Sequence, residues 1–402
     1  MKKLPLPFVI SAIALVIAFV AFAIWGIPYF LQPTSFVHNE AAFSSTTDRA
    51  RVTQILEEGN IRFGEHQQPY QVLRVELLEG EYEGILMEVD YGKRQLRSDT
   101  NRFQPGDQIY VQIGKDPQGF VTAYYSDYVR TNPLLILLGV FVVSIIVMAG
   151  WKGVGSLLSL AFSMTVITGY IIPHILAGED PLRVSLIGST ILLGTTLYVT
   201  YGWNMKTHAS VVSMVIALLL TGLLSAFFVS FTRLTGSGQE NALFLIQFSP
   251  VIINLRGLLL GGMIIGALGV LDDLVSSQSA AVFEIYDANP DQDFRHIFRK
   301  AMSIGQDHVA ATVNTLVLAY TGASLPLLLL FTLSSENYGV LFNLGFMAEE
   351  LVRTLVGSLG LIAAVPITSL IATALALHGH RMGEWRMLLG PDTGHGSHQH
   401  SH

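Results

Sequence analysis

Long apolar runs separated by short polar connections make up most of the chain. Several runs exceed the roughly 18 apolar residues that are typical of a membrane-spanning helix. The first lies at about 6–30, and later ones lie at 133–151, 154–176, 182–203, 207–232, 245–271, 308–333 and 343–373. The pattern predicts an all-α polytopic membrane protein with about eight transmembrane helices.

The first apolar run has two interpretations. Ala21-Phe22-Ala23 resembles the cleavage site of a signal peptide. However, the apolar run continues past that site through Ile27. We therefore favour an uncleaved N-terminal transmembrane anchor over residues 1–31.

A polar block follows the first run. Residues 49–130 hold 23 of the chain's 53 charged residues in about a fifth of its length. Short segments there alternate or are β-branched and are bounded by Gly, Pro or Asp, which is typical of strands. The clearest are Gln71–Leu77, Gly84–Val89, Gln108–Ile113 and Phe120–Tyr125. We expect a small inserted β domain at 32–132, either a barrel, for which an OB-like fold is one option, or a sandwich.

Lysine and arginine in short loops predict the orientation of the spans. With the amino terminus in the cytoplasm, the basic residues that fall inside are Lys2, Lys3, Lys152, Lys206, Arg295, Arg299, Lys300, Arg381 and Arg386. The outside loops keep Arg183 and Arg233. This predicts a multi-pass plasma-membrane protein with an extracytoplasmic β domain, both termini in the cytoplasm and a seven-span domain at 133–377. Residues 272–306 would form a cytoplasmic loop, and residues 378–402 a cytoplasmic His-rich tail.

Composition excludes several functional classes. The chain is 51% hydrophobic and 13% charged, and its net charge of −7 offers no basic surface for nucleic acid. Cysteine is absent, which excludes disulfides, thiolate zinc sites and cysteine nucleophiles. The sequence also lacks a Walker phosphate loop, H-E-x-x-H and G-x-S-x-G. We expect no cofactor and no common enzymatic activity, and an unusual intramembrane enzyme is left open. In the tail, His395, His398, His400 and His402 leave weak metal binding open.

The run at 245–271 is followed at once by two adjacent carboxylates. Its glycines form two overlapping small-xxx-small patterns, which allow close packing of another helix; they are Gly257, Gly261, Gly262 and Gly266. Acidic groups beside a membrane span usually face protein, water or a cation. This end of the run is therefore a candidate for cation coordination or proton relay, through Asp272, Asp273, Ser276, Ser277 and Gln278. The structural alternative is a hydrated boundary at which Asp caps the next helix.

A polar stripe marks the start of the next run. It consists of Asp307, His308, Thr312, Asn314 and Thr315, which form two adjacent faces of a helix. The stripe and the acidic pair flank one predicted loop. We therefore expect Asp307 and Asn314 to share a cytoplasm-facing cavity for an ion or substrate with Asp272 and Asp273. Interhelical hydrogen bonding by Thr and Asn is the alternative.

The last run begins with Glu349, Glu350 and Arg353. Either glutamate can neutralise Arg353 within the helix, because they are four and three positions apart. Arg256, at the outer end of its own run, could instead pair with one of these glutamates across helices. We interpret the four residues as structural charge pairing, with a gate or entrance site as the alternative.

Three long blocks in the carboxy-terminal half are the most distinctive part of the sequence. They read GALGVLDDLVSSQSAAVFEI, AMSIGQDHVAATVNTLVLAYTGASLPLLLLF and AEELVRTLVGSLGLIAAVPITSLIA. These blocks resemble the YibE/F-like family of bacterial membrane proteins, and the resemblance extends more weakly over about 45–377. It places Asp272, Asp273, Gln278, Asp307, His308, Asn314 and Glu349 in the family pattern. It implies a multi-span membrane protein without an established activity or substrate.

The sequence therefore supports two functions from different classes. The first is a transporter or channel for an ion or small solute, built around the acidic pair and the polar stripe. The alternative is a non-transporting membrane scaffold or envelope-sensing protein whose β domain binds an extracytoplasmic protein partner. A transporter needs a polar cavity that reaches mid-membrane, whereas a scaffold can seal the same residues into helix contacts. The lipid bilayer is a partner in both cases, and the oligomeric state is left open.

Overall fold

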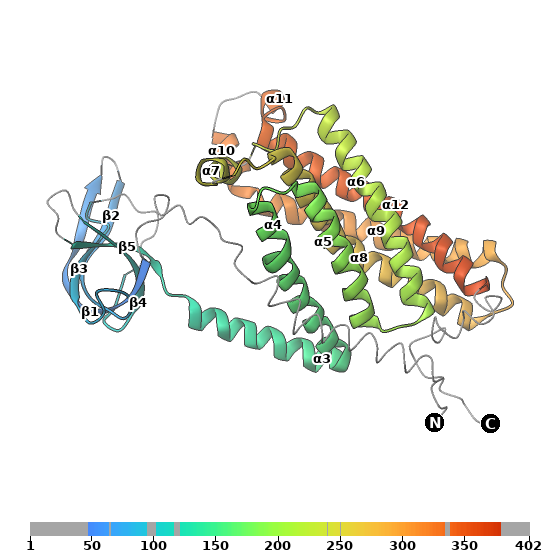
Figure 1. Cartoon of the computed structure of the whole chain (residues 1–402), viewed down its shortest axis with the longest axis horizontal. Coiled ribbons are helices and arrows are strands. Elements are labelled where there is room, and N and C mark those ends of the chain that lie inside the picture. The colour runs from blue at the N-terminus through green and yellow to red at the C-terminus, as the bar shows by residue number, and fades with distance from the viewer. Residues whose placement is uncertain are drawn as a thin grey trace. The chain divides into compact units, whose positions relative to one another are not determined.

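A computed structural model describes residues 47–63, 66–94, 102–115, 121–238, 240–249, 251–333 and 338–378. These residues fall into two compact units, whose boundary lies between Ser144 and Ile145. We call them the β unit and the helical unit (Figure 1). The predicted N-terminal anchor and the four tail histidines lie outside the described residues.

The β unit is a five-stranded antiparallel sheet of order β3-β2-β1-β4-β5. Its strands are β1 (Thr47–Phe63), β2 (His66–Leu77), β3 (Leu86–Tyr91), β4 (Gln108–Lys115) and β5 (Val121–Tyr128). The long β1 pairs with both β2 and β4, so that Ala50 faces Leu77 on one side and Ile109 on the other. The strand predictions located β2 to β5 but missed β1, whose charged sequence hides its alternation.

An aromatic cluster closes the β unit into a near-barrel. The rings of Tyr91 on β3 and Tyr125 on β5 lie 4.9 Å apart. Both rings pack against the buried Phe103. Because neighbouring strands are all antiparallel, the two edge strands β3 and β5 run in the same direction and meet at their carboxyl ends. The barrel is thus favoured over the sandwich, while the extracytoplasmic location remains a prediction.

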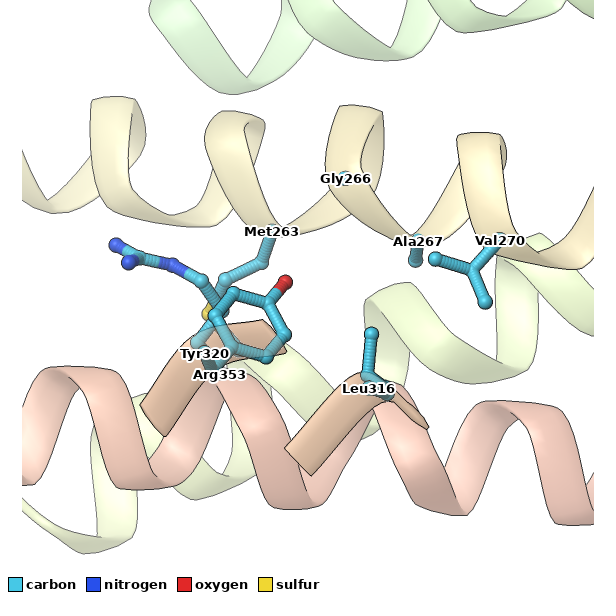
Figure 2. A pocket seen from close by; sticks show the side chains of 8 residues that line it. Met263, Gly266, Ala267, Val270, Leu316, Tyr320 and Arg353 are labelled. Carbon is cyan, nitrogen blue, oxygen red and sulfur yellow. The ribbon is translucent and has the colours of Figure 1, made fainter. Parts of the chain in front are cut away.

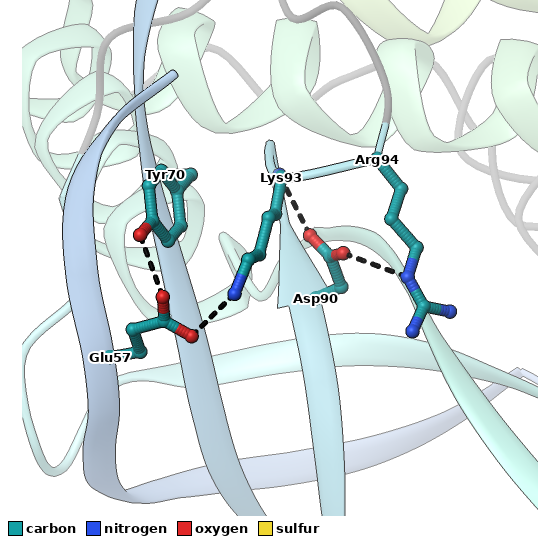
Figure 3. A network of polar contacts seen from close by, with 5 residues as sticks. All are labelled: Glu57, Tyr70, Asp90, Lys93 and Arg94. Atoms are coloured by element: carbon teal, nitrogen blue, oxygen red, sulfur yellow. Dashed lines mark hydrogen bonds and ion pairs between the residues drawn. The ribbon is translucent and has the colours of Figure 1, made fainter.

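The surface of the β unit carries paired charges. Glu57 accepts hydrogen bonds from Tyr70, at 2.7 Å, and from Lys93, at 2.5 Å. Asp90 accepts from the Lys93 backbone and pairs with Arg94 (Figure 3). The bonds from Lys93 and Tyr70 lower the pKa of Glu57. These contacts join β1, β2 and the turn that follows β3.

The helical unit contains long helices separated by tight turns. The helices are α3 (Thr131–Val166), the π-helical turn η2 (Ile167–Ile171), α4 (Ile172–Leu176), α5 (Pro181–Tyr201), α6 (Met205–Phe231), α7 (Glu240–Phe248), α8 (Leu255–Ala288), α9 (Phe294–Ala323), α10 (Leu325–Leu333), α11 (Tyr338–Leu341) and α12 (Gly345–His378); α3 begins in the β unit's part of the chain. Gly150, with φ of 57°, divides α3 into two apolar segments. Glycine tolerates this left-handed conformation without a Cβ clash.

Six helical segments of the described chain are long and apolar enough to cross a membrane. They are Thr131–Gly150, Gly153–Leu176, Pro181–Tyr201, Met205–Phe231, Leu255–Ala288 and Gly345–His378. The chain is therefore a mostly helical protein with the character of a membrane-embedded one. The predicted span at 308–333 is not a single helix, because α9 ends at Ala323 and α10 starts with Pro326 at its second position. Proline suits the first turn of a helix, where its missing N–H is not needed.

The segment 272–306, predicted to be a polar cytoplasmic loop, is largely helical, while its cytoplasmic location stays a prediction. In this segment α8 continues as a helix to Ala288, and α9 begins at Phe294 after a short turn. Asp293 caps α9 by accepting from the backbone of His296. The predicted end of the first helix was too early because it was placed where the apolar residues end, whereas a helix can continue as an amphipathic one.

Small residues bring the long helices together. A Cβ on Gly261 of α8 would lie 2.3 Å from Ser185 Oγ of α5. A Cβ on Gly360 of α12 would lie 2.3 Å from Thr221 Oγ1 of α6. The expected close packing on α8 is thus made by Gly261, together with Gly257, whereas Gly262 is exposed with nothing within 4 Å.

Candidate functional site

The acidic pair lies in the middle of α8, not at its end. Asp272 is half-buried, and its Oδ1 is buried without a hydrogen-bond partner. Asp273, the next residue, is exposed. Successive residues of a helix point about 100° apart. The two carboxylates therefore meet different surroundings although they are adjacent in sequence.

Two serines extend the face of α8 on which Asp272 lies. Ser276 Oγ donates to the hydroxyl of Tyr201 at 3.2 Å, and Ser279 Oγ donates to the backbone oxygen of Lys206 at 2.9 Å. Asp272, Ser276 and Ser279 follow the spacing of one helix face. This face therefore lies against the turn between α5 and α6. Sequence reasoning missed Tyr201, which is exposed at the end of an apolar helix and reaches Ser276 only through its hydroxyl.

Gln278 joins three helices. It is 1% exposed, and its Nε2 donates to Ala301 O of α9 and to Ser369 Oγ of α12, both at 2.8 Å. Its Oε1 is buried without a partner. A Cβ on Gly305 of α9 would lie 2.8 Å from that oxygen and 2.3 Å from Val365 Cγ1. The contact between α8, α9 and α12 at Gln278 therefore requires glycine at position 305. The sequence alone does not indicate this requirement.

The polar stripe on α9 is only partly turned inward. Asp307, Asn314 and Thr315 are exposed, and Thr312 and Thr315 donate to backbone oxygens of their own helix. His308 is partly buried, with Nδ1 3.3 Å from Ser277 Oγ of α8. The structure thus brings the two predicted groups into contact through His308 and Ser277. In the part of the chain that is described, no three His, Asp or Glu side chains are grouped to hold a metal ion.

Of the four residues predicted to pair charges, two do so. Glu350 and Arg353 form an ion pair within the first turns of α12. Glu349 is 2% exposed and accepts from the backbone N–H of Gly238 at 3.0 Å. Arg256 is exposed and makes no ion pair with any described residue. The cross-helix pair expected for Arg256 is therefore absent, because the loop before α7 reaches Glu349 instead.

A small cleft lies between α8, α9 and α12, away from the acidic pair (Figure 2). It is lined by Met263, Gly266, Ala267, Val270, Leu316, Tyr320, Arg353 and Gly357. Its volume is about 10 Å³, which is room for about one water. The cleft is therefore not an open channel through the helical unit.

Comparison with known proteins gives one match. A family model described as YibE/F-like protein matches residues 137–378, which is more than half of the chain. The match starts within α3 and ends at the last residue of α12, so it covers the helical unit and leaves out the five strands. No curated protein and no solved structure matches the chain.

Proposed function

The chain belongs to the YibE/F-like family, and we propose that its helical unit is a transporter or channel that moves a cation across the membrane. The family has no established function, so the proposal depends on the site itself. The observation that carries it is Asp272, whose carboxylate oxygen Oδ1 is buried without a hydrogen-bond partner in the middle of α8.

The length of α8 keeps Asp272 close to the hydrocarbon. The helix has 34 residues and is about 51 Å long at 1.5 Å per residue, whereas the hydrocarbon core is about 30 Å thick. Every stretch of about 20 residues within it, the length needed to span, includes both aspartates. A carboxylate at or within the edge of the hydrocarbon is costly unless water, a proton or a cation accompanies it. That cost favours a functional role for Asp272.

The charge of the site favours a cation as cargo. A carboxylate repels anions, and the neighbouring groups on the same face are the hydroxyl oxygens of Ser276 and Tyr201. A loosely built oxygen site also suits passage, because conduction requires binding that is weak enough to release the ion. Gln278 and His308 would support the site by fixing α9 and α12 against α8.

Flux in liposomes tests the proposal. The purified chain would be reconstituted, and uptake of protons, Na⁺, K⁺, Mg²⁺ and Ca²⁺ compared with that of empty liposomes. We expect at least one cation to move faster with the protein present. Rates equal to those of empty liposomes for every cation, with the protein shown to be folded, would contradict it.

One observation favours the alternative function, a non-transporting scaffold or envelope sensor. The amide of Gln278 is sealed into a three-helix contact, and buried hydroxyls such as those of Ser213 and Ser358 donate to backbone oxygens of their own helices. Such contacts need no solvent path. In this alternative the β unit binds a protein partner, and the flux experiment returns no cation.

We further propose that the β unit is extracytoplasmic and that both termini are cytoplasmic, on the basis of the lysine and arginine distribution. The chain has no cysteine, so a single Glu81→Cys variant can be labelled without background. A membrane-impermeant maleimide should label it in intact cells. Labelling only after cell disruption would reverse the orientation.

A further inference from the structure

The cleft between α8, α9 and α12 opens on the outer surface of the helical unit. Gly266, on its α8 wall, is exposed, and an added Cβ there would lie 3.9 Å from the Tyr320 hydroxyl of α9. The other walls are largely apolar, with Leu316 and Val270 at the end away from Arg353 (Figure 2). Asp272 does not line this cleft, so the cleft is a separate site from the proposed cation path.

Two hydrogen-bond donors gather at one end of the cleft. Arg353 Nη1 donates to Glu350, and no described residue accepts from the remaining guanidinium groups. The Tyr320 hydroxyl likewise has no hydrogen-bond partner among the described residues, and it lies within electrostatic range of both Arg353 and Glu350. Donors without acceptors are unfavourable in surroundings that lack water. This end of the cleft therefore suits a ligand that brings acceptor oxygens.

We propose that the cleft binds a phospholipid of the surrounding bilayer. One acyl chain would lie along Gly266 and Leu316, and the phosphate would accept from Arg353 and Tyr320. The residues that line an empty gap between membrane helices lack van der Waals contacts. In a bilayer, the acyl chains of lipids can fill such a gap. Guanidinium groups bind phosphate oxygens strongly and with defined geometry.

The dimensions and position of the cleft agree with a lipid. The cleft is shallow, since its volume of about 10 Å³ is far below the roughly 300–1,000 Å³ of pockets that enclose small molecules. A chain lying along the surface therefore fits better than an enclosed solute. Arg353 lies eight residues from the start of α12, about 12 Å along the axis. This places the donors toward one end of a spanning helix, where headgroups lie.

A second copy of the chain is the competing occupant, since glycines on membrane helices also favour helix association. A partner helix would cover Gly266 with apolar side chains. It would leave the Tyr320 hydroxyl and the free guanidinium donors without acceptors. The two unpaired donors therefore favour the lipid.

Photocrosslinking in nanodiscs tests the proposal with the full chain. The nanodiscs would contain phosphatidylglycerol with a diazirine on one acyl chain, and adducts would be mapped by mass spectrometry. We expect adducts to concentrate on residues 263–270 and 316–320. Gly266→Leu should reduce them several-fold by filling the cleft. Gly262→Leu is the matched control, because Gly262 is exposed on the same helix, one turn away, and does not line the cleft.

The donors are tested with the Glu350→Gln/Arg353→Gln double variant, which removes the ion pair without leaving one charge alone. We expect it to lose the preference for phosphatidylglycerol over a diacylglycerol with the same chains. Adducts spread evenly along α8, equal losses in the two glycine variants, or protein–protein crosslinks that replace lipid adducts at the cleft would each overturn the proposal. If Gly266→Leu fails to reconstitute, the wild-type adducts test the proposal: concentration on residues 263–270 and 316–320 would support it, and an even spread along α8 would overturn it.

Discussion

The β unit and the helical unit place their polar side chains differently. In the β unit most charged groups lie on the surface and several are paired, as in Arg49 with Glu79 and Lys93 with Glu57. In the helical unit many polar groups are buried between helices. Of the seven buried side-chain atoms without a hydrogen-bond partner in the described chain, six belong to this unit and one, Asp48 Oδ2, to the β unit. A site for chemistry or transport is therefore to be sought among the helices.

Because polar groups are buried between its helices, the stability of the helical unit should change when a single methyl group is added at a tight contact. Gly305→Ala would place a methyl group 2.3 Å from Val365 Cγ1 and 2.8 Å from Gln278 Oε1. Overpacking of this kind costs about 1–3 kcal/mol, so we expect a clear drop in the thermal unfolding midpoint in detergent. Gly322→Ala, on the same helix with nothing within 4 Å, should be neutral or stabilising. Equal midpoints for the two variants would show that the junction at Gln278 is not tightly packed.

Glu349 and Arg256 should differ in the same direction. Glu349→Leu would leave the Gly238 N–H without its acceptor, which costs about 1–3 kcal/mol for a buried group. Arg256→Leu removes an exposed, unpaired side chain, and such changes usually stay within about 0.5 kcal/mol. Thermal unfolding of both variants measures the difference. A larger loss of stability for Arg256→Leu than for Glu349→Leu would instead support a cross-helix pair of Arg256, which the structure lacks.

In the β unit the expected effects are smaller and depend on pH. Lys93 and Tyr70 lower the pKa of Glu57, and Arg49 lowers that of Glu79. A carboxylate whose pKa is lowered in the folded state stabilises that state at pH values above its unfolded pKa. This stabilisation is lost as the pH falls through the folded pKa. Pairing of β1 with β2 should therefore weaken as the pH falls below 4.5, the ordinary pKa of glutamate.

Hydrogen exchange of β1 and β2 amides in the full chain, corrected for the intrinsic pH dependence, measures this effect. The Glu57→Gln/Glu79→Gln variant should show a weaker response to acid, because its side chains do not titrate. Since both glutamates are on the surface, we expect a modest change. An identical acid response in the variant and the wild type would show that these pairs do not contribute.

Much of this contrast was predictable from sequence, because the apolar runs and the charged block are long. The family, the membrane character and the position of four strands followed directly. β1 was missed since its charges, including Glu57 and Glu58, mask its alternation. The hairpin of α8 and α9 was missed because hydropathy records where apolar residues end, which need not be where a helix ends.

The arrangement of the candidate site was harder to predict, since it depends on which helices are neighbours. Gly261 and Gly262 are adjacent in the sequence, yet of the two only Gly261 contacts α5. Glu349 was expected to meet a side chain and instead meets the backbone of Gly238. Contacts from distant segments decide both outcomes, and a single sequence does not record them.

In the proposed function the half-buried Asp272, and not negative charge in general, serves passage of a cation. Asp272→Asn and its exposed neighbour Asp273→Asn provide a matched pair. Both variants would be reconstituted at equal protein density in liposomes, and flux of the cation that the wild type transports would be recorded. We expect flux at the level of empty liposomes for Asp272→Asn and near the wild-type rate for Asp273→Asn. Wild-type flux through Asp272→Asn, or an equal loss in both variants, would contradict it.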